Sequence, residues 1–297
     1  MILRMQTARI VSYNADHFDP EQLSGDQYQY LDTGIENRFE HIPSLLSELE
    51  PDIILMQELY GTDQTQLEES ARGLAQKLGF SCEFQGEVTA AKSQHHNLGT
   101  GVLWGPRFEP TAYTRVSNLW QPLNIVEGTI DGQPLTGASF HAQSVGKVET
   151  CGDTRPSDHE KLLAIARRYP RIILGADWNG ISKWDTDPQP ETPLHEVMTP
   201  REVAFVLNRS PANILEDGGL IDLAAYYAHS TGGILETTTG GRPTREGPQR
   251  LDRLYAWQAI AERICAISVI KTELAGKLSD HYPKVLDLDI SPLKTYL

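Results

Sequence analysis

Long apolar runs and paired cysteines are both absent from this sequence, and each absence excludes a class of protein. No apolar run is long enough to cross a bilayer as a helix. Near the N-terminus, Arg4 and Arg9 interrupt the apolar pattern and no small-residue cleavage site follows, unlike a secretory signal peptide. The 3 cysteines are an odd number without paired spacing, as in proteins that keep their thiols reduced. We therefore expect a cytoplasmic protein without membrane insertion.

Positive charge is also scarce. Lysine and arginine total 26 against 40 aspartates and glutamates, which gives a formal net charge of −14. This balance argues against nucleic-acid binding through a broad basic surface. It does not exclude a nuclease, because clustered carboxylates can hold a divalent ion, and that ion supplies positive charge to a phosphate.

The sequence contains no linker, repeat or low-complexity tract that would divide it. With 39% hydrophobic and 22% charged residues among 297, the composition is that of a globular protein with a substantial core. We expect a single domain over residues 1–297.

One stretch, RIILGADWNG at residues 171–180, changes character half-way. Its apolar first half predicts a strand that is buried on both faces. Because side chains alternate along an extended chain, Asp177 and Asn179 leave on one side and Trp178 on the other. An isolated Asp-x-Asn is more often a turn that closes a strand. Its functional interpretation therefore depends on whether other predicted strands also end in polar residues.

Two earlier apolar segments also end in polar residues. Residues 6–13 predict a strand with Asn14 at its tip, and residues 52–58 predict a buried strand that ends at Glu58. Apolar positions at helical spacing between residues 34 and 49 predict the helix that joins these strands.

The remaining segments mix helices with mostly antiparallel strands. Asp131-Gly132 is a strong hairpin signal, and the return strand ends at His141. Residues 229–249 form a Gly-, Thr- and Arg-rich loop of a length that is usually functional. This arrangement favours two sheets packed face to face with helices outside. Further helices are expected over 64–78, 156–169, 202–207 and 220–227, and further strands over 82–84, 101–104, 124–130, 133–141, 250–257, 265–271 and 285–290.

The polar strand ends belong to short pieces whose order along the chain is informative. These pieces are SYNAD, MQELY, ASFHAQ, GADWNG, RLDRLYAW and SDHYP. Together they resemble the endonuclease/exonuclease/phosphatase superfamily, which has the deoxyribonuclease I-like fold, and they occur in that family's order. The resemblance implies an α/β fold, a four-layer α-β-β-α sandwich of two mostly antiparallel sheets flanked by helices, with the site at one rim of the paired sheets.

The resemblance also implies a metal site. Glu58 corresponds to the family's principal metal ligand, assisted by Asn14 and Asp280. The chemistry asks for these residue types, because Mg²⁺ or Mn²⁺ prefers oxygen ligands and keeps several waters. One departure from the family pattern is Ala176, which stands before Asp177 where the family usually has Gly-Asp directly.

Five further residues take catalytic roles in the resemblance. Asp177 and Asn179 would align or deprotonate the attacking water. His281 would contact the scissile phosphate while Asp252 accepts its other ring proton, which fixes the tautomer and favours protonation. His141 would help to neutralise the developing charge.

Each of these residues has an ordinary alternative, such as a turn, a solvated strand end or a hairpin histidine. Their joint occurrence in family order favours the functional interpretation.

Other residues of the sequence have two interpretations, and the sequence does not decide between them. Basic residues near the motifs contact substrate phosphates or are solvated, tryptophans stack on a ring or pack in the core, and two adjacent histidines belong to a second metal site or an exposed loop. These residues are Lys147, Arg155, Arg242, Arg245, Arg250 and Arg253, then Trp120, Trp178 and Trp184, and finally His95 and His96.

The sequence therefore predicts an enzyme, a Mg²⁺- or Mn²⁺-dependent phosphoric ester hydrolase. The first hypothesis is a nuclease-like phosphodiester hydrolase, with a phosphoester substrate such as DNA or RNA and in-line attack of water on phosphorus. The alternative is a phosphatase or phosphodiesterase for a small phosphorylated metabolite, nucleotide or lipid head group, which the acidic balance favours. An inactive binding protein on this fold is a weaker third hypothesis. Substrate-binding residues and oligomeric state are not readable from the sequence.

Overall fold

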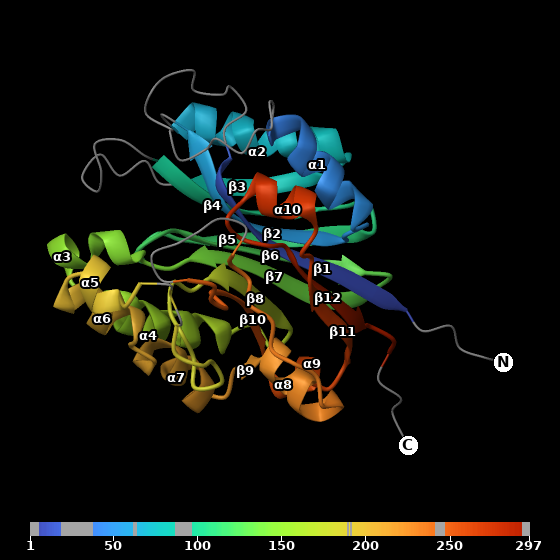
Figure 1. The fold of residues 1–297 in the computed structure, drawn as a ribbon. Helices are drawn as coiled ribbons and strands as arrows, with labels where there is room; N and C mark the ends of the chain where they lie inside the picture. Colours follow the sequence, from blue (N-terminus) through green and yellow to red (C-terminus); the bar gives the residue numbers. More distant parts are fainter. Residues whose placement is uncertain are drawn as a thin grey trace.

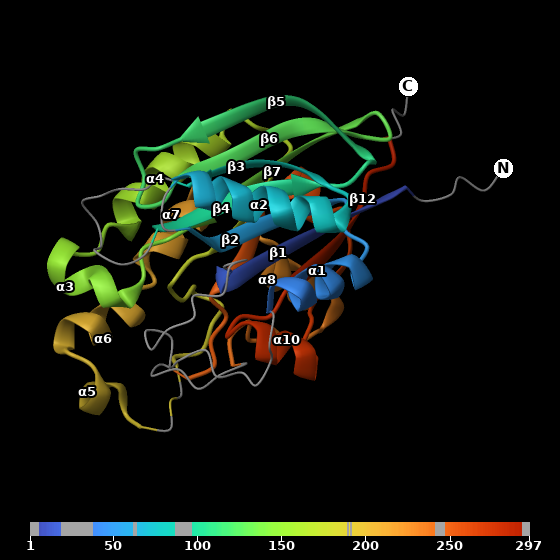
Figure 2. The same ribbon diagram turned by 90° about the horizontal axis from the view of Figure 1, so that it is seen from above.

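Two six-stranded sheets lie face to face in the computed structural model, and helices cover the outer side of each sheet (Figure 1). The structure describes residues 6–18, 38–61, 64–86, 97–188, 190, 192–240 and 247–292. A second view, from above, shows three helices together over one sheet, namely α1 (Arg38–Glu48), α2 (Gln64–Leu78) and α10 (Glu273–Leu278) (Figure 2). The expected α-β-β-α sandwich is confirmed.

The strand order is β11-β12-β1-β2-β4-β3 in the first sheet and β5-β6-β7-β8-β10-β9 in the second. The first sheet consists of β1 (Thr7–Phe18), β2 (Ile53–Gly61), β3 (Ser81–Gly86), β4 (Asn97–Trp104), β11 (Ile264–Val269) and β12 (Lys284–Asp289). The second consists of β5 (Phe108–Val116), β6 (Leu123–Ile130), β7 (Gln133–His141), β8 (Ile172–Asp177), β9 (Ile221–Asp222) and β10 (Asp252–Ala256).

A parallel pair of strands lies at the centre of each sheet, among antiparallel neighbours. In the first sheet β1 runs parallel to β2, and β12 and β4 flank them in the opposite direction. In the second, β7 runs parallel to β8, and β6 and β10 flank them. Parallel strands end at the same edge of a sheet, so each pair delivers two carboxyl ends to one edge.

Apolar side chains fill three layers of the sandwich. Leu55 and Leu254 lie in the layer between the sheets. Leu46 of α1 and Leu74 of α2 lie outside the first sheet, and Leu162 of α4 lies outside the second.

None of the described helices combines the length and the apolar character that crossing a membrane requires. The helices are α1 (Arg38–Glu48), α2 (Gln64–Leu78), η2 (Val145–Lys147), α3 (Val148–Cys151), α4 (Arg155–Ala166), α5 (Leu194–Val197), α6 (Pro200–Val206), α7 (Ser210–Asp217), α8 (Leu223–Thr231), α9 (Gln258–Ala261) and α10 (Glu273–Leu278).

Two strands continue past the residues at which we expected them to end. β1 extends beyond Asn14, and β2 extends beyond Glu58. Both are irregular there, because the register between β1 and β2 shifts after Asn14 and the register between β2 and β4 shifts between Met56 and Leu59. The expected strand ends are therefore wrong, and both polar residues lie at irregular points within longer strands.

Among the other elements, α2 has the bounds that the apolar spacing predicts, 64–78. The expected start of the helix over 34–49 lies outside the described residues, as does part of the long loop over 229–249, whose first residues continue α8. Sequence analysis did not find β5, most of whose side chains are exposed. It also did not find α7, because Pro211 suggested a loop, although proline is well accommodated in the first turn of a helix.

Gly175 lies in β8 where the two sheets approach each other. A Cβ atom at this position would lie 2.6 Å from Leu55 Cδ1 and 3.0 Å from Leu254 Cδ2. Because a close-packed interior accepts an added methyl group only by shifting its neighbours, we expect Gly175→Ala to lower the free energy of unfolding by about 1–3 kcal/mol, measured by urea titration. The control is Gly233→Ala at an exposed position, which should change that free energy by less than about 0.5 kcal/mol. Equal effects at the two positions would contradict the packing argument.

Candidate active site

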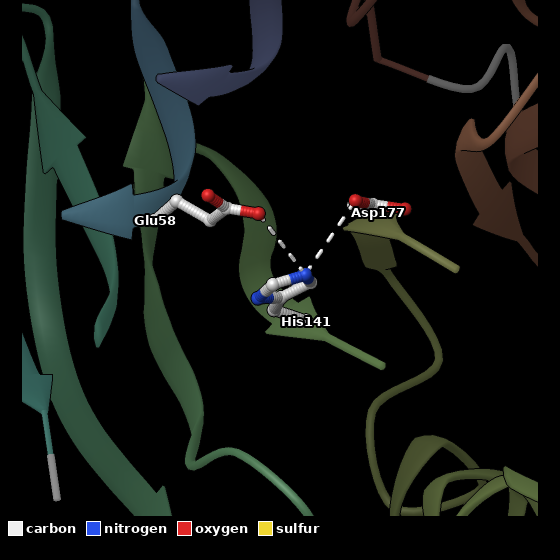
Figure 3. A group of neighbouring side chains, drawn as sticks. All are labelled: Glu58, His141 and Asp177. Atoms are coloured by element: carbon white, nitrogen blue, oxygen red, sulfur yellow. Dashed lines mark ion pairs between the residues drawn. The ribbon is translucent and has the colours of Figure 1, made fainter. Parts of the chain in front are cut away.

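Glu58 is positioned by a bulge in β2. The register with β4 shifts between Met56 and Leu59, so Gln57 and Glu58 together oppose Thr100. Glu58 has a φ of 55°, in the left-handed region that residues other than glycine rarely adopt. An extra residue in a strand redirects a side chain, and Glu58 points toward the ends of β7 and β8 (Figure 3).

His141 and Asp177 are the last residues of β7 and β8, and they are direct partners in the parallel register. On the other side of β8, Asp252 at the start of β10 is the antiparallel partner of Asp177. The pairing of three neighbouring strands thus aligns three ionisable residues in one row. All three are buried, so their charges are balanced by neighbouring protein groups more than by solvent.

The two sheets meet where Glu58 reaches His141 and Asp177 (Figure 3). His141 Nε2 lies 3.5 Å from Glu58 Oε1 and 3.5 Å from Asp177 Oδ2. Asn14 Nδ2 donates hydrogen bonds of 3.0 Å to the same two oxygen atoms. Two carboxylates from different sheets therefore converge, with a histidine and an amide between them.

These residues fit a divalent cation. One ligand atom from each of Glu58, His141 and Asp177 lies within 4.8 Å of the others, and carboxylate oxygens are the ligands that Mg²⁺ and Mn²⁺ prefer. Asn14 Oδ1 accepts the backbone N–H of Asp16 at 3.0 Å, so coordination through that oxygen requires the opposite orientation of the amide. Asp280, the third predicted ligand, lines the same cavity as Glu58 and Asp177.

Asp252 holds the second histidine of the site. His281 Nδ1 lies 2.8 Å from Asp252 Oδ2, and its Nε2 lies 3.7 Å from Asp177 Oδ2 and 3.8 Å from Asp280 Oδ1. Burial acts to lower the pKa of His281, but the charges of Asp252, Asp280 and Asp177 outweigh burial and raise that pKa well above its usual value. The three carboxylates thus favour the charged imidazolium form of His281. Ser279 fixes this segment to β1, because its hydroxyl donates to the carbonyl of Asn14 at 2.8 Å and accepts the His281 N–H at 3.0 Å.

His141 and Asp177 stabilise each other's charged form. Burial opposes protonation of His141, yet its pKa is raised because Asp177 and Glu58 face the ring. Burial likewise opposes ionisation of Asp177, yet His281 and His141 hold its pKa well below the usual range. The two histidines thus favour the ionised form of Asp177, which can ligate a cation.

Asn179 is fixed by bonds to both its side chain and its backbone. Its N–H donates to Asp177 Oδ1 at 2.8 Å, and its side-chain amide lies 3.0 Å from His141 Nε2. Its φ of 45° is again in the left-handed region. Two buried arginines hold the chain in this conformation, because Arg155 donates to the carbonyl of Asn179 and Arg253 donates to the carbonyl of Gly180 at 2.7 Å.

Three arginines near the motifs were expected either to contact substrate phosphates or to be solvated, and both expectations are wrong. Arg155, Arg250 and Arg253 are neither solvated nor free to contact a phosphate, since each is at most 4% exposed. Arg250 lies 2.6 Å from Asp185 and 2.6 Å from Asp222. Sequence analysis missed this role because these acidic partners are remote in the chain.

The remaining candidates do not gather at the site. Trp178 is buried in the core outside the second sheet, and Trp184 is 49% exposed. Trp120 and Lys147 are half-buried, and neither lines the cavity that contains Glu58. The candidates that lie outside the described residues are His95, His96, Arg242 and Arg245.

Comparison with models of known protein families assigns this chain to a family. The model of the endonuclease/exonuclease/phosphatase family matches residues 11–281, which include every residue of the cluster. The chain belongs to this family. Its members are phosphoester hydrolases that generally use divalent metal ions. No curated protein sequence is significantly similar to the chain.

Solved structures of the endonuclease/exonuclease/phosphatase fold resemble the chain over nearly its whole length. TDP2 from D. rerio, complexed with a single strand DNA product, is 16% identical with a TM-score of 0.61, covering 95% of this chain and 98% of that one. The 3′ phosphatase NExo from Neisseria, bound to a product DNA hairpin, is 17% identical with a TM-score of 0.60, covering 95% and 99%. The catalytic domain of human Nocturnin, with a bound sulfate anion, is 15% identical with a TM-score of 0.58, covering 95% and 93%. These similarities confirm the fold.

Asp252→Asn removes the nearest carboxylate from His281. In the metal-free protein we expect the pKa of His281 to fall toward its ordinary value of 6.5, as measured by NMR titration of the imidazole resonances. A histidine whose pKa is raised by folding contributes stability fully below its unfolded pKa and loses that contribution as pH rises through its folded pKa. The stability advantage of the wild type over the variant should therefore shrink as pH rises above about 6.5.

The control for this titration is Asp187→Asn, which neutralises an exposed carboxylate that pairs with Arg209. It should leave the pKa of His281 unchanged. An unaltered His281 titration in Asp252→Asn would contradict the assigned ion pair.

Proposed function

We propose that this protein is a divalent-metal-dependent phosphodiester hydrolase of the nuclease type. The observation that supports the proposal is the position of the Glu58, His141 and Asp177 cluster beside the Asp252–His281 pair. Oxygen ligands for a cation and a charged imidazole thus lie close enough to engage one phosphate. In-line attack by water on phosphorus needs both features, because negative charge grows on the phosphoryl and leaving oxygens.

The proposed metal ion is Mg²⁺ or Mn²⁺. Glu58 would be its principal ligand, with Asn14 and Asp280 as predicted further ligands and Asp177 as a neighbouring carboxylate. When bound, such an ion polarises a phosphoryl oxygen and stabilises the charge that develops there.

The protein's own residues orient the water and the phosphate. Asp177, kept ionised by the two histidines, would align the attacking water and accept its proton, assisted by Asn179. His281 would donate from Nε2 to a phosphate oxygen, while Asp252 holds Nδ1 at 2.8 Å and so fixes the ring. His141 would offset charge on the phosphoryl group as the electron pair moves to the leaving oxygen.

Nucleic acid is the first candidate substrate, because structures of TDP2 and NExo with the same fold contain DNA products. A small phosphoester is the alternative, and a separate observation favours it. The chain carries a formal net charge of −14, and Arg155, Arg250 and Arg253 are committed to buried contacts. These arginines therefore add nothing to a basic surface for a phosphate backbone.

The test of the proposed function compares an aryl phosphodiester with its matching monoester, in Mg²⁺ and in chelator. We expect metal-dependent cleavage of the diester, and a loss of about 100-fold or more in kcat/KM for Glu58→Gln, because several kcal/mol of charge stabilisation disappear. Glu262→Gln, at an exposed position, is the control and should match the wild type. Turnover that persists in chelator would refute the proposal, and preference for the monoester would favour the phosphatase alternative.

Asp252→Asn tests the role of the second histidine in turnover. The neutral amide stabilises the His281 imidazolium less than the carboxylate does, so we expect kcat to fall by about 100-fold or more while the cooperative unfolding transition is retained. Parallel steady-state kinetics and thermal unfolding measure the two effects, with Asp187→Asn as the control. Near-normal turnover of Asp252→Asn would exclude the assigned role.

A further inference from the structure

The cavity beside the candidate metal centre is lined by both polar and apolar residues. Its volume is about 170 Å³, far more than a single water needs and comparable to a cavity of about 150 Å³ that holds benzene. The polar lining residues include Asp177 and His281. The lining also contains four apolar residues, Val145, Phe205, Val206 and Leu251. These apolar residues have no part in the proposed chemistry.

One of the apolar lining residues, Phe205, is linked to Asn179 through a single buried side chain, that of Arg155. The guanidinium of Arg155 lies 3.3 Å from the centroid of the Phe205 ring, and Arg155 donates to the Phe205 carbonyl at 2.6 Å. The same guanidinium donates to the carbonyl of Asn179. Asp153 neutralises Arg155 through an ion pair of 2.9 Å. Because one buried guanidinium contacts both residues, Phe205 has a fixed place relative to Asn179.

The lining of the cavity limits what can bind there together with a phosphate. A second phosphate would be repelled by the carboxylates Asp280 and Asp177 and would lose hydration against apolar residues such as Val145, and both effects are unfavourable to it. An uncharged ring carries no such penalty. It gains free energy in proportion to the apolar surface that it buries.

We propose that this cavity is a subsite for a planar, uncharged ring carried by the phosphoester substrate, with Val145, Phe205, Val206 and Leu251 as its apolar wall. The inference rests on the proposed function, since it assumes that the phosphate binds beside Glu58, Asp177 and His281. It adds that substrates with a ring near the phosphate bind better than aliphatic or polyphosphorylated ones. Such a ring could be bonded directly to the phosphate group or be the base of a nucleotide.

Binding of two ligand pairs tests the subsite by isothermal titration calorimetry in Mg²⁺. Phenylphosphonate and methylphosphonate differ in a ring next to phosphorus, whereas thymidine 5′-phosphate and deoxyribose 5-phosphate differ in a base beyond the sugar. We expect the ring-bearing member of at least one pair to bind about tenfold or more tighter, given the apolar area of one ring. The pair with the larger ratio identifies the distance between ring and phosphate.

Variants of Val145 test whether the preference for ring-bearing ligands arises in the cavity. Val145→Trp fills the space and Val145→Asp places a carboxylate on its wall, so both should bring the affinity ratio close to one, provided that thermal unfolding shows a folded protein. Val197 is the matched control, because it is 38% exposed and does not line the cavity. Val197→Trp and Val197→Asp should keep the wild-type ratio.

Ring-bearing ligands that bind no better in either pair, or that do not bind, overturn the subsite. A ratio that survives in both Val145 variants also overturns it. The outcome is separable from that of the proposed function, because affinity is measured without turnover. Intact metal-dependent hydrolysis with equal affinities would refute the subsite alone, and a ring preference without hydrolysis would refute the proposed function alone.

Discussion

Four polar side chains converge because a parallel pair of strands lies at the centre of each sheet, and the candidate site depends on this convergence. β1 and β2 bring Asn14 and Glu58 from one sheet, while β7 and β8 bring His141 and Asp177 from the other. Carboxylates held this close repel one another unless positive charge or hydrogen-bond donors lie between them. In the metal-free protein the Asn14 amide and the His141 ring occupy that position. The direction of the strands thus sets the location of the site. The repulsion between Glu58 and Asp177 explains why an amide and a histidine lie between them.

Backbone strain and buried ion pairs then hold these groups in place. Glu58 and Asn179 both have positive φ, a conformation that costs of order 1 kcal/mol or more per residue and persists only where the surroundings enforce it. Arg155 and Arg253 provide part of that enforcement at the end of β8. Removing a guanidinium from water is costly unless it is paired. These two buried arginines are paired and fix the conformation of the loop after β8.

Much of this architecture was predictable from sequence, for identifiable reasons. Buried strands such as 172–177 leave a continuous apolar run, and short polar motifs in family order indicated that Glu58, Asp177 and His281 would meet. The bulge at Glu58 was not predictable, because no glycine or proline marks it. The structural role of Arg250 was hidden for a different reason, since its acidic partners lie elsewhere in the chain. Local patterns thus predicted elements and motif positions, whereas long-range ion pairs and strained conformations became visible only in three dimensions.

The position of β1 has a consequence for how the chain acquires its structure. β1 lies between β2 and β12, and its ladder with β12 pairs Thr7 with Asp289. During synthesis one edge of β1 therefore stays without its native partner until the last described strand has been made, and an open strand edge invites incorrect pairing. His281 also enters the chain late, shortly before β12. Closure of the first sheet and formation of the Asp252–His281 pair are thus nearly simultaneous events. The pairing of β1 with β12 depends on contacts of very high sequence separation, which form slowly.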